Sequence, residues 1–162
     1  MSFSTQAPRL VQSLPGGLIN GVINGAISWS AFKSLPQVPL STDSISAPGV
    51  TALGNAATAV LALTFIITSI TFFVFRRGAR KSGSAPDALT QMPYWTRGLG
   101  IAVRNTLLSF GAVVAAAVLW QRFAGTVMVS PLAAALVVAV MALAATVWSE
   151  MRTKREMLGL PG

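Results

Sequence analysis

The chain has 162 residues, of which 53% are hydrophobic and only 10% are charged, whereas about 25% are charged in a typical soluble domain. It contains no Cys and no His, which excludes disulfides, thiolate metal ligands and the side chain most often used as a general base or metal ligand. We therefore expect no enzyme, no catalytic or metal site and no cofactor. The net charge of +8 does not predict nucleic-acid binding, because the basic residues cluster at the ends of apolar segments.

Four long segments are almost free of charge, at about residues 14–32, 51–75, 98–120 and 131–148. Each approaches the roughly 20 apolar residues that an α-helix needs to cross a hydrocarbon layer about 30 Å thick. The pattern predicts an all-α fold, a single four-helix transmembrane domain over residues 1–162. Short connections predict two antiparallel hairpins, the first helix with the second and the third with the fourth.

The first helix is predicted to open at Pro15, Gly16 and Gly17 and to end near Phe32. A small-x-small cleavage site is weak here, so we expect this helix to be retained and not removed as a signal peptide. Residues 34–49 are too rich in Pro to form a helix, and a linker is favoured over a cap on the bundle.

The second helix is predicted to stop at Arg76 and Arg77, at the start of a basic loop over residues 76–97 that lies against anionic lipid headgroups. Pro93 is expected in the first turn of the third helix. A short connection leads through Ser130, a predicted N-cap, into an Ala-rich fourth helix. This helix is followed by a basic tail over residues 149–162.

The basic residues predict an orientation in the membrane. With a cytoplasmic N-terminus, nine of them fall on the cytoplasmic side, against two on the opposite side, Lys33 and Arg122. The positive-inside rule then places both termini in the cytoplasm, and we expect a multi-pass protein of a bacterial inner membrane. The nine are Arg9, Arg76, Arg77, Arg80, Lys81, Arg97, Arg152, Lys154 and Arg155.

A ridge of Gly17, Gly21 and Gly25 repeats the G-xxx-G spacing, which lets two helices approach closely in lipid. Asn20 and Asn24 flank it at the same spacing and could hydrogen-bond across the contact. Packing within the chain is the first interpretation. The alternative is an interface with a second copy or with another subunit.

Arg104 lies inside the third apolar segment and is followed by Asn105. An arginine inside a span costs at least about 2.5 kcal/mol unless it reaches the interface or finds a partner. Arg104 lies about 24 Å below Trp120 at about 1.5 Å per residue, so snorkelling to the cytoplasmic boundary is the first interpretation. A binding contact or polar path formed by Asn20, Asn24, Arg104 and Asn105 is the alternative. No acidic residue lies inside any predicted span, which leaves Arg104 without a carboxylate partner and disfavours proton-coupled transport.

An internal duplication is possible. The segment GLINGVINGAISW from Gly17 aligns with GLGIAVRNTLLSF from Gly98 at an offset of 81, and AVLALT from Ala59 aligns with AVMALA from Ala139 at an offset of 80. Two copies that both start in the cytoplasm would form a parallel repeat about an axis along the membrane normal. Such a repeat places Asn24 and Asn105 at equivalent depth.

The strings GLINGVINGAISW, VPLSTDSIS and LWQRFAGTVMVSPLAAALVV resemble small uncharacterised bacterial four-span inner-membrane proteins that are sometimes labelled permeases. The resemblance covers most of the chain and implies a bacterial origin, but it transfers no binding or catalytic residue.

The strongest signals concern helix packing and topology, so the sequence favours a non-enzymatic structural or accessory subunit. It would pack through its Gly-rich and Ala-rich helix faces as a homo-oligomer or within a larger membrane complex. The alternative is a small permease or channel for a neutral or anionic solute, acting as a homo-oligomer. A holin-like pore and a membrane-bound enzyme are less favoured.

Overall fold

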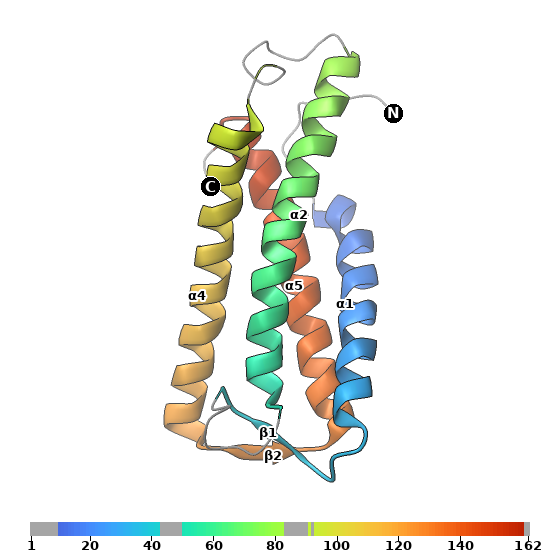
Figure 1. Ribbon diagram of the computed structural model, residues 1–162, viewed down its shortest axis with the longest axis vertical. Coiled ribbons are helices and arrows are strands. Elements are labelled where there is room, and N and C mark those ends of the chain that lie inside the picture. The colour runs from blue at the N-terminus through green and yellow to red at the C-terminus, as the bar shows by residue number, and fades with distance from the viewer. Residues whose placement is uncertain (1–9, 43–49, 83–90, 92, 161–162) are drawn as a thin grey trace.

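The computed structural model describes residues 10–42, 50–82, 91 and 93–160 and shows a bundle of long helices closed at one end by a short β-ribbon (Figure 1). The elements in chain order are α1 (Leu10–Phe32), β1 (Val38–Leu40), α2 (Ala52–Ser82), the π-helix η1 (Tyr94–Gly98), α4 (Leu99–Ala124), β2 (Val127–Val129) and α5 (Pro131–Met157). Below, the end with β1 and β2 is the ribbon end, and the opposite end is the basic end.

Within the described residues, three helices are long and apolar enough to cross a membrane: α2, the continuous helix formed by η1 and α4, and α5. They correspond to the predicted segments 51–75, 98–120 and 131–148. The first helix is not among them, because its glycines, asparagines and serines lower the mean hydropathy of α1. A fourth span at residues 14–32 therefore stays a prediction.

The bounds of α1 differ from the predicted ones. The helix begins at Leu10, so that Pro15 lies inside it, although proline cannot donate the backbone hydrogen bond of that turn. The turn before Pro15 nevertheless packs on the bundle, since Ser13 is completely buried. Tertiary contact thus outweighs the signal of Pro15 as a helix start.

The predicted end of the second helix at Arg76 is also wrong. Helix α2 continues to Ser82, and Ala79 in its extension is buried against Met157 of α5. This contact explains why the helix passes Arg76, Arg77 and Gly78. The predicted basic loop is correspondingly shorter, and residues 83–90 and 92 lie outside the described residues.

The π-helix η1 begins directly after Pro93, which accepts the backbone N–H groups of Arg97 and Gly98 at 3.1 and 3.4 Å. Tyr94 anchors it to α2: the ring stacks on Phe73 with centroids 4.5 Å apart, and the hydroxyl lies 3.0 Å from that of Ser69. A β-carbon at Gly98 would lie 2.5 Å from the Tyr94 ring, so this close approach requires glycine.

The helices do not pack as the two predicted hairpins. Helix α5 packs along both α1 and α2, and α2 packs in turn along α4, which gives the spatial order α1, α5, α2, α4 (Figure 1). The two helices of each predicted hairpin are therefore separated by a helix from the other half. Contacts between α4 and α5 include two at the basic end, from Asn105 to Thr153 and from Arg104 to Glu156.

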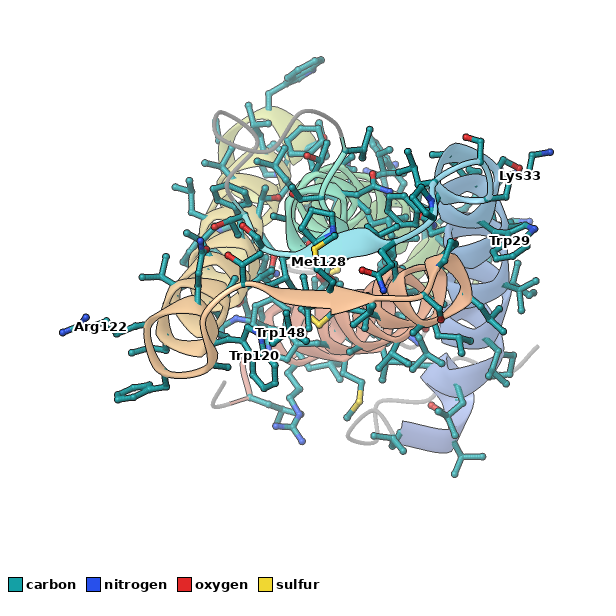
Figure 2. The ribbon with its side chains drawn as sticks, turned by 90° about the horizontal axis from the view of Figure 1, so that it is seen from below. Trp29, Lys33, Trp120, Arg122, Met128 and Trp148 are labelled. Carbon is teal, nitrogen blue, oxygen red and sulfur yellow. The ribbon has the colours of Figure 1, made fainter. Side chains whose placement is uncertain are left out.

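The ribbon end is closed by β1 and β2, which pair antiparallel with Val38 opposite Val129 and Leu40 opposite Val127 and cross the end of the bundle (Figure 2). Val38 is completely buried in an apolar cluster with Phe32 of α1, Ala52 and Ala56 of α2, and Ala134, Ala135 and Val138 of α5. Residues 38–40 are thus a cap, and the favoured interpretation of residues 34–49 as a linker is wrong for this part. Residues 43–49 lie outside the described residues.

Candidate functional site

The glycine ridge of α1 faces α5 of the same chain. A β-carbon at Gly21 would lie 3.0 Å from the carbonyl oxygen of Ala139, and one at Gly17 would lie 2.6 Å from a methyl group of Val147. At Gly25 it would lie 2.9 Å from the β-carbon of Ala139. The Gly-rich face and the Ala-rich face therefore pack against each other, and we call this contact the glycine seam.

An apolar groove runs along the exposed border of the glycine seam. It has a volume of about 370 Å³ and lies between α1 and α5 in the half of the bundle nearer the ribbon. Its floor consists of small residues, and its walls are larger apolar side chains. The floor comprises Gly21, Gly25, Ala26, Ala135 and Ala139, and the walls comprise Leu18, Val22, Trp29, Leu132, Leu136, Val140 and Leu143.

Asn20 and Asn24 do not bond across the seam. The Asn24 amide donates to the backbone carbonyl of Asn20, 2.9 Å away on the same helix. Asn20 lines a cavity of about 270 Å³ between α1, α2 and α5, together with Thr71, Glu150 and Lys154. Glu150 and Lys154 form an ion pair one turn apart on α5.

Glu150 lies two positions beyond the predicted end of the last span at residue 148. It belongs to α5, which is apolar enough to span, and apolar residues such as Ile67 and Ile70 line the same cavity. The expectation that no acidic residue lies inside a span stays a prediction.

Arg104 has a carboxylate partner within the chain, contrary to the sequence-based expectation. Its guanidinium pairs with Glu156 of α5, which also accepts from Nε of Arg152 at 3.0 Å. The Glu156 side chain is only 11% exposed, whereas that of Arg104 is 56% exposed. The pair forms because α5 stays helical to Met157 and because the basic end of α4 approaches it.

Asn105 is completely buried and donates from its amide to the hydroxyl of Thr153, 3.5 Å away. Asn24 lies beside Gly25, whose neighbour on α5 is Ala139. Ala139 and Thr153 are 14 positions apart, or about 20 Å along α5 at about 1.5 Å per residue. The structure therefore separates Asn24 from Asn105, so their predicted equivalence in depth is wrong, and the four candidate residues do not line one path.

Buried hydroxyl groups form a second feature that the sequence analysis missed. Thr64, Thr68 and Thr71 of α2 are buried, as are Thr106 of α4 and Thr146, Ser149 and Thr153 of α5. Ser109 of α4 donates to Thr64 at 2.8 Å, and Thr153 donates to the carbonyl of Ser149 at 2.6 Å. We call this set of buried hydroxyl residues, together with Ser109, the hydroxyl seam; the hydroxyls of Thr68, Thr106 and Thr146 in it have no hydrogen-bond partner among the described residues. Their spacing of three or four positions within apolar helices is the signal that could have revealed it.

Among the described residues, no group of three or more acidic side chains is placed to hold a metal ion. Comparison with known proteins finds no protein family, no curated protein and no solved structure that matches the chain. The function therefore has to be inferred from the fold and its contacts.

Proposed function

We propose that this protein is a non-enzymatic integral membrane protein, a structural or accessory subunit that receives a transmembrane helix of a partner in the groove beside the glycine seam. The observation that carries the proposal is this groove of about 370 Å³ between α1 and α5. Since the glycine and alanine faces already pack on each other, the partner contacts their border and not the ridge itself.

The chemistry of the groove suits a helix. In lipid, helices associate through close van der Waals packing, which small residues permit. Gly21, Gly25 and Ala139 provide such a floor, and Leu18 and Val22 remain more than half exposed on the wall. Because α1 packs on α5 and falls short of the hydropathy of the three candidate spans, a partner on its free side would also support its insertion.

We further propose that α1 forms a fourth span and that both termini face the cytoplasm of a bacterium. Lys33 follows α1 at the ribbon end and Arg122 lies in the last turn of α4 there, and both side chains point away from the bundle (Figure 2). The opposite end carries basic residues on α2, η1 and α5. This asymmetry supports the positive-inside orientation and a contact of residues 76–97 with anionic headgroups.

The burial pattern supports an internal repeat, with an offset other than the predicted 81 for the first helices. Ser13, Gly17 and Ser28 of α1 are buried, as are Ala102, Thr106 and Ala117 of α4, each 89 positions later. The strands obey the same offset, since 38–40 and 127–129 also differ by 89. For α2 and α5 the offset is 78, as between Val60 and Val138 or Thr68 and Thr146. The spatial order α1, α5, α2, α4 is the order that a two-fold axis between α5 and α2 would produce.

The test is the composition of the complex formed by the tagged protein at its natural level in its own host. Ala26→Trp fills the groove from an exposed alanine, and Ala116→Trp places the same side chain on an exposed position of α4 outside it. We expect other subunits to co-purify in a fixed ratio with the wild type and with Ala116→Trp, and to be lost with Ala26→Trp. Equal retention by both variants would contradict the proposal.

A second candidate is the small permease or channel for a neutral or anionic solute, working as a homo-oligomer. The cavity that Asn20 shares with Glu150 and Lys154, near the hydroxyl seam, favours it. Flux into liposomes that is lost in Asn20→Leu but kept in Asn24→Leu would support this candidate, because only Asn20 lines the cavity. Absence of flux in a defined homo-oligomer would oppose it.

A further inference from the structure

A cleft at the basic end is lined largely by polar and charged residues, whereas the groove beside the glycine seam is apolar. Thr96 and Arg97 of η1, with Gly100, Ile101 and Arg104 of α4, form one side, and Glu156 of α5 faces them. Its volume of about 520 Å³ lies within the range of about 300–1,000 Å³ that small-ligand sites occupy. The cleft is therefore large enough for a ligand group and not merely for a water molecule.

The charges in this cleft leave an excess of positive charge. Glu156 is shared between Arg104 and Arg152, and among the described residues none forms an ion pair with Arg97. Two arginines thus face one carboxylate that is already engaged. The pair with Glu156 also fixes the Arg104 guanidinium at the edge of the cleft, where it stays 56% exposed and keeps donors for an anion.

Gly100 keeps the space between the two arginines open. A β-carbon there would meet no atom within 4 Å, in contrast to Gly98 two positions earlier, where packing against Tyr94 leaves no room for one. The packing of the bundle therefore does not require glycine at position 100. A larger side chain at this position would enter the cleft and exclude a ligand.

The position of the cleft indicates the source of the anion. Trp95, beside it in the chain, is 79% exposed, and exposed tryptophans are typical of the headgroup level of a bilayer. Toward the ribbon end, α4 exposes Val103 and Leu107, which could contact an acyl chain below the headgroup. A free phosphate would make no use of these apolar residues.

We propose that the cleft binds the phosphate of an anionic phospholipid through Arg97, Arg104 and the Thr96 hydroxyl, with Gly100 leaving room for the headgroup. Arginine suits this role because its planar guanidinium donates two hydrogen bonds to one phosphate. The proposal rests on the membrane placement proposed above. It is independent of the partner helix and of the groove beside the glycine seam, which lies nearer the ribbon end.

The test compares retention of phosphatidylglycerol and phosphatidylcholine by the full chain in detergent, measured by native mass spectrometry. We expect the wild type to prefer phosphatidylglycerol. Arg97→Gln should weaken its binding about fivefold, which corresponds to about 1 kcal/mol for one basic residue. Gly100→Leu should weaken it at least about tenfold while both arginines remain in place.

Arg122→Gln is the matched control, since Arg122 lies at the other end of α4, and it should bind as the wild type does. Arg104→Gln also breaks the pair with Glu156, so the decision rests on Gly100→Leu and Arg97→Gln, which leave that pair intact. The proposal that the cleft binds the lipid would be overturned if both of these variants bound phosphatidylglycerol as the wild type does, or if Arg122→Gln weakened binding equally.

An excess of inorganic phosphate distinguishes the two sources of the anion. Phosphatidylglycerol should resist this competitor, because its acyl chains add contacts on α4. Complete displacement would show that the cleft binds a free phosphate and not the phospholipid. Membrane fractionation of cells tests the proposed function separately from the lipid assay in detergent. A protein that is absent from the membrane fraction would contradict the proposed function, whatever lipid the cleft binds.

Discussion

The two outer helices are attached to the centre of the bundle by seams of different chemistry. Helix α1 meets α5 through Gly17, Gly21 and Gly25, where the backbones approach so closely that β-carbons do not fit. Helix α4 meets α2 through side chains, as in the hydrogen bond of 2.8 Å from Ser109 to Thr64. Within lipid the hydrophobic effect does not drive helices together. Dispersion at short range, as in the glycine seam, and hydrogen bonding, as between Ser109 and Thr64, are two forces that can do so instead.

The two seams differ in how much added side-chain volume they tolerate. The glycine seam is intolerant of added volume, and its border forms a groove floored by small residues. The hydroxyl seam combines polar contacts, such as that of Ser109 with Thr64, with buried hydroxyls that have no partner among the described residues, and it continues toward the ion pairs of Glu156 at the basic end. In the proposed repeat, Gly17 corresponds to Thr106. The same position would then carry a glycine for close packing in one half and a buried hydroxyl in the other.

The largest effect is expected at the glycine seam. In Gly21→Leu the new β-carbon would meet the carbonyl oxygen of Ala139 at 3.0 Å and the β-carbon of Leu143 at 3.2 Å, and a backbone carbonyl within a packed helix cannot move aside. We expect α1 to be pushed off α5, with a loss of about 3 kcal/mol or more in the free energy of unfolding. Reversible unfolding in sodium dodecyl sulfate measures it.

Gly111→Leu is the control for that substitution, because a β-carbon at Gly111 would meet no atom within 4 Å. Its free energy of unfolding should not fall and should rise by no more than about 1 kcal/mol, because leucine is a better helix former than glycine. If Gly21→Leu and Gly111→Leu are equally stable, the close approach of the two backbones is not what holds α1 on α5.

A smaller effect is expected from Asn105→Ala in α4. The variant removes a completely buried amide and its hydrogen bond to Thr153, which should cost about 1–2 kcal/mol of the free energy of unfolding. Asn24→Ala is the comparison, since that side chain is half-buried and bonds to the carbonyl of its own helix. It should cost no more than about 0.5 kcal/mol in the same assay. A larger cost at Asn24 would mean that the predicted polar contact across α1 exists after all.

The sequence predicted the three long apolar helices and the concentration of basic residues at one end, because both depend on composition over a long window. It also predicted the ridge of Gly17, Gly21 and Gly25 as a packing face, but not which helix meets it. Local periodicity describes a face without identifying its partner. The expected hairpins were wrong because α5 inserts between α1 and α2.

Other features were missed for related physical reasons. Strands of three residues, such as β1 and β2, are too short to show an alternating pattern. The pair of Arg104 with Glu156 requires that α5 continue beyond residue 148 and that the end of α4 approach it, which are both tertiary facts. The cleft around Gly100 could not be predicted either, since a glycine in a sequence does not reveal whether its missing β-carbon faces packing or open space.

The smallest expected effect tests the hydroxyl seam most directly. Thr64→Val keeps the shape of the side chain and removes its acceptor, while Ser109→Ala removes the donor, so the double-mutant cycle isolates their hydrogen bond of 2.8 Å. Because an unfolded helix in a membrane also finds polar partners, the coupling should be only about 0.6 kcal/mol and not above about 1.7 kcal/mol. A coupling near zero would show that volume alone joins α4 to α2. The two seams would then differ in the size of their residues but not in the force that holds them.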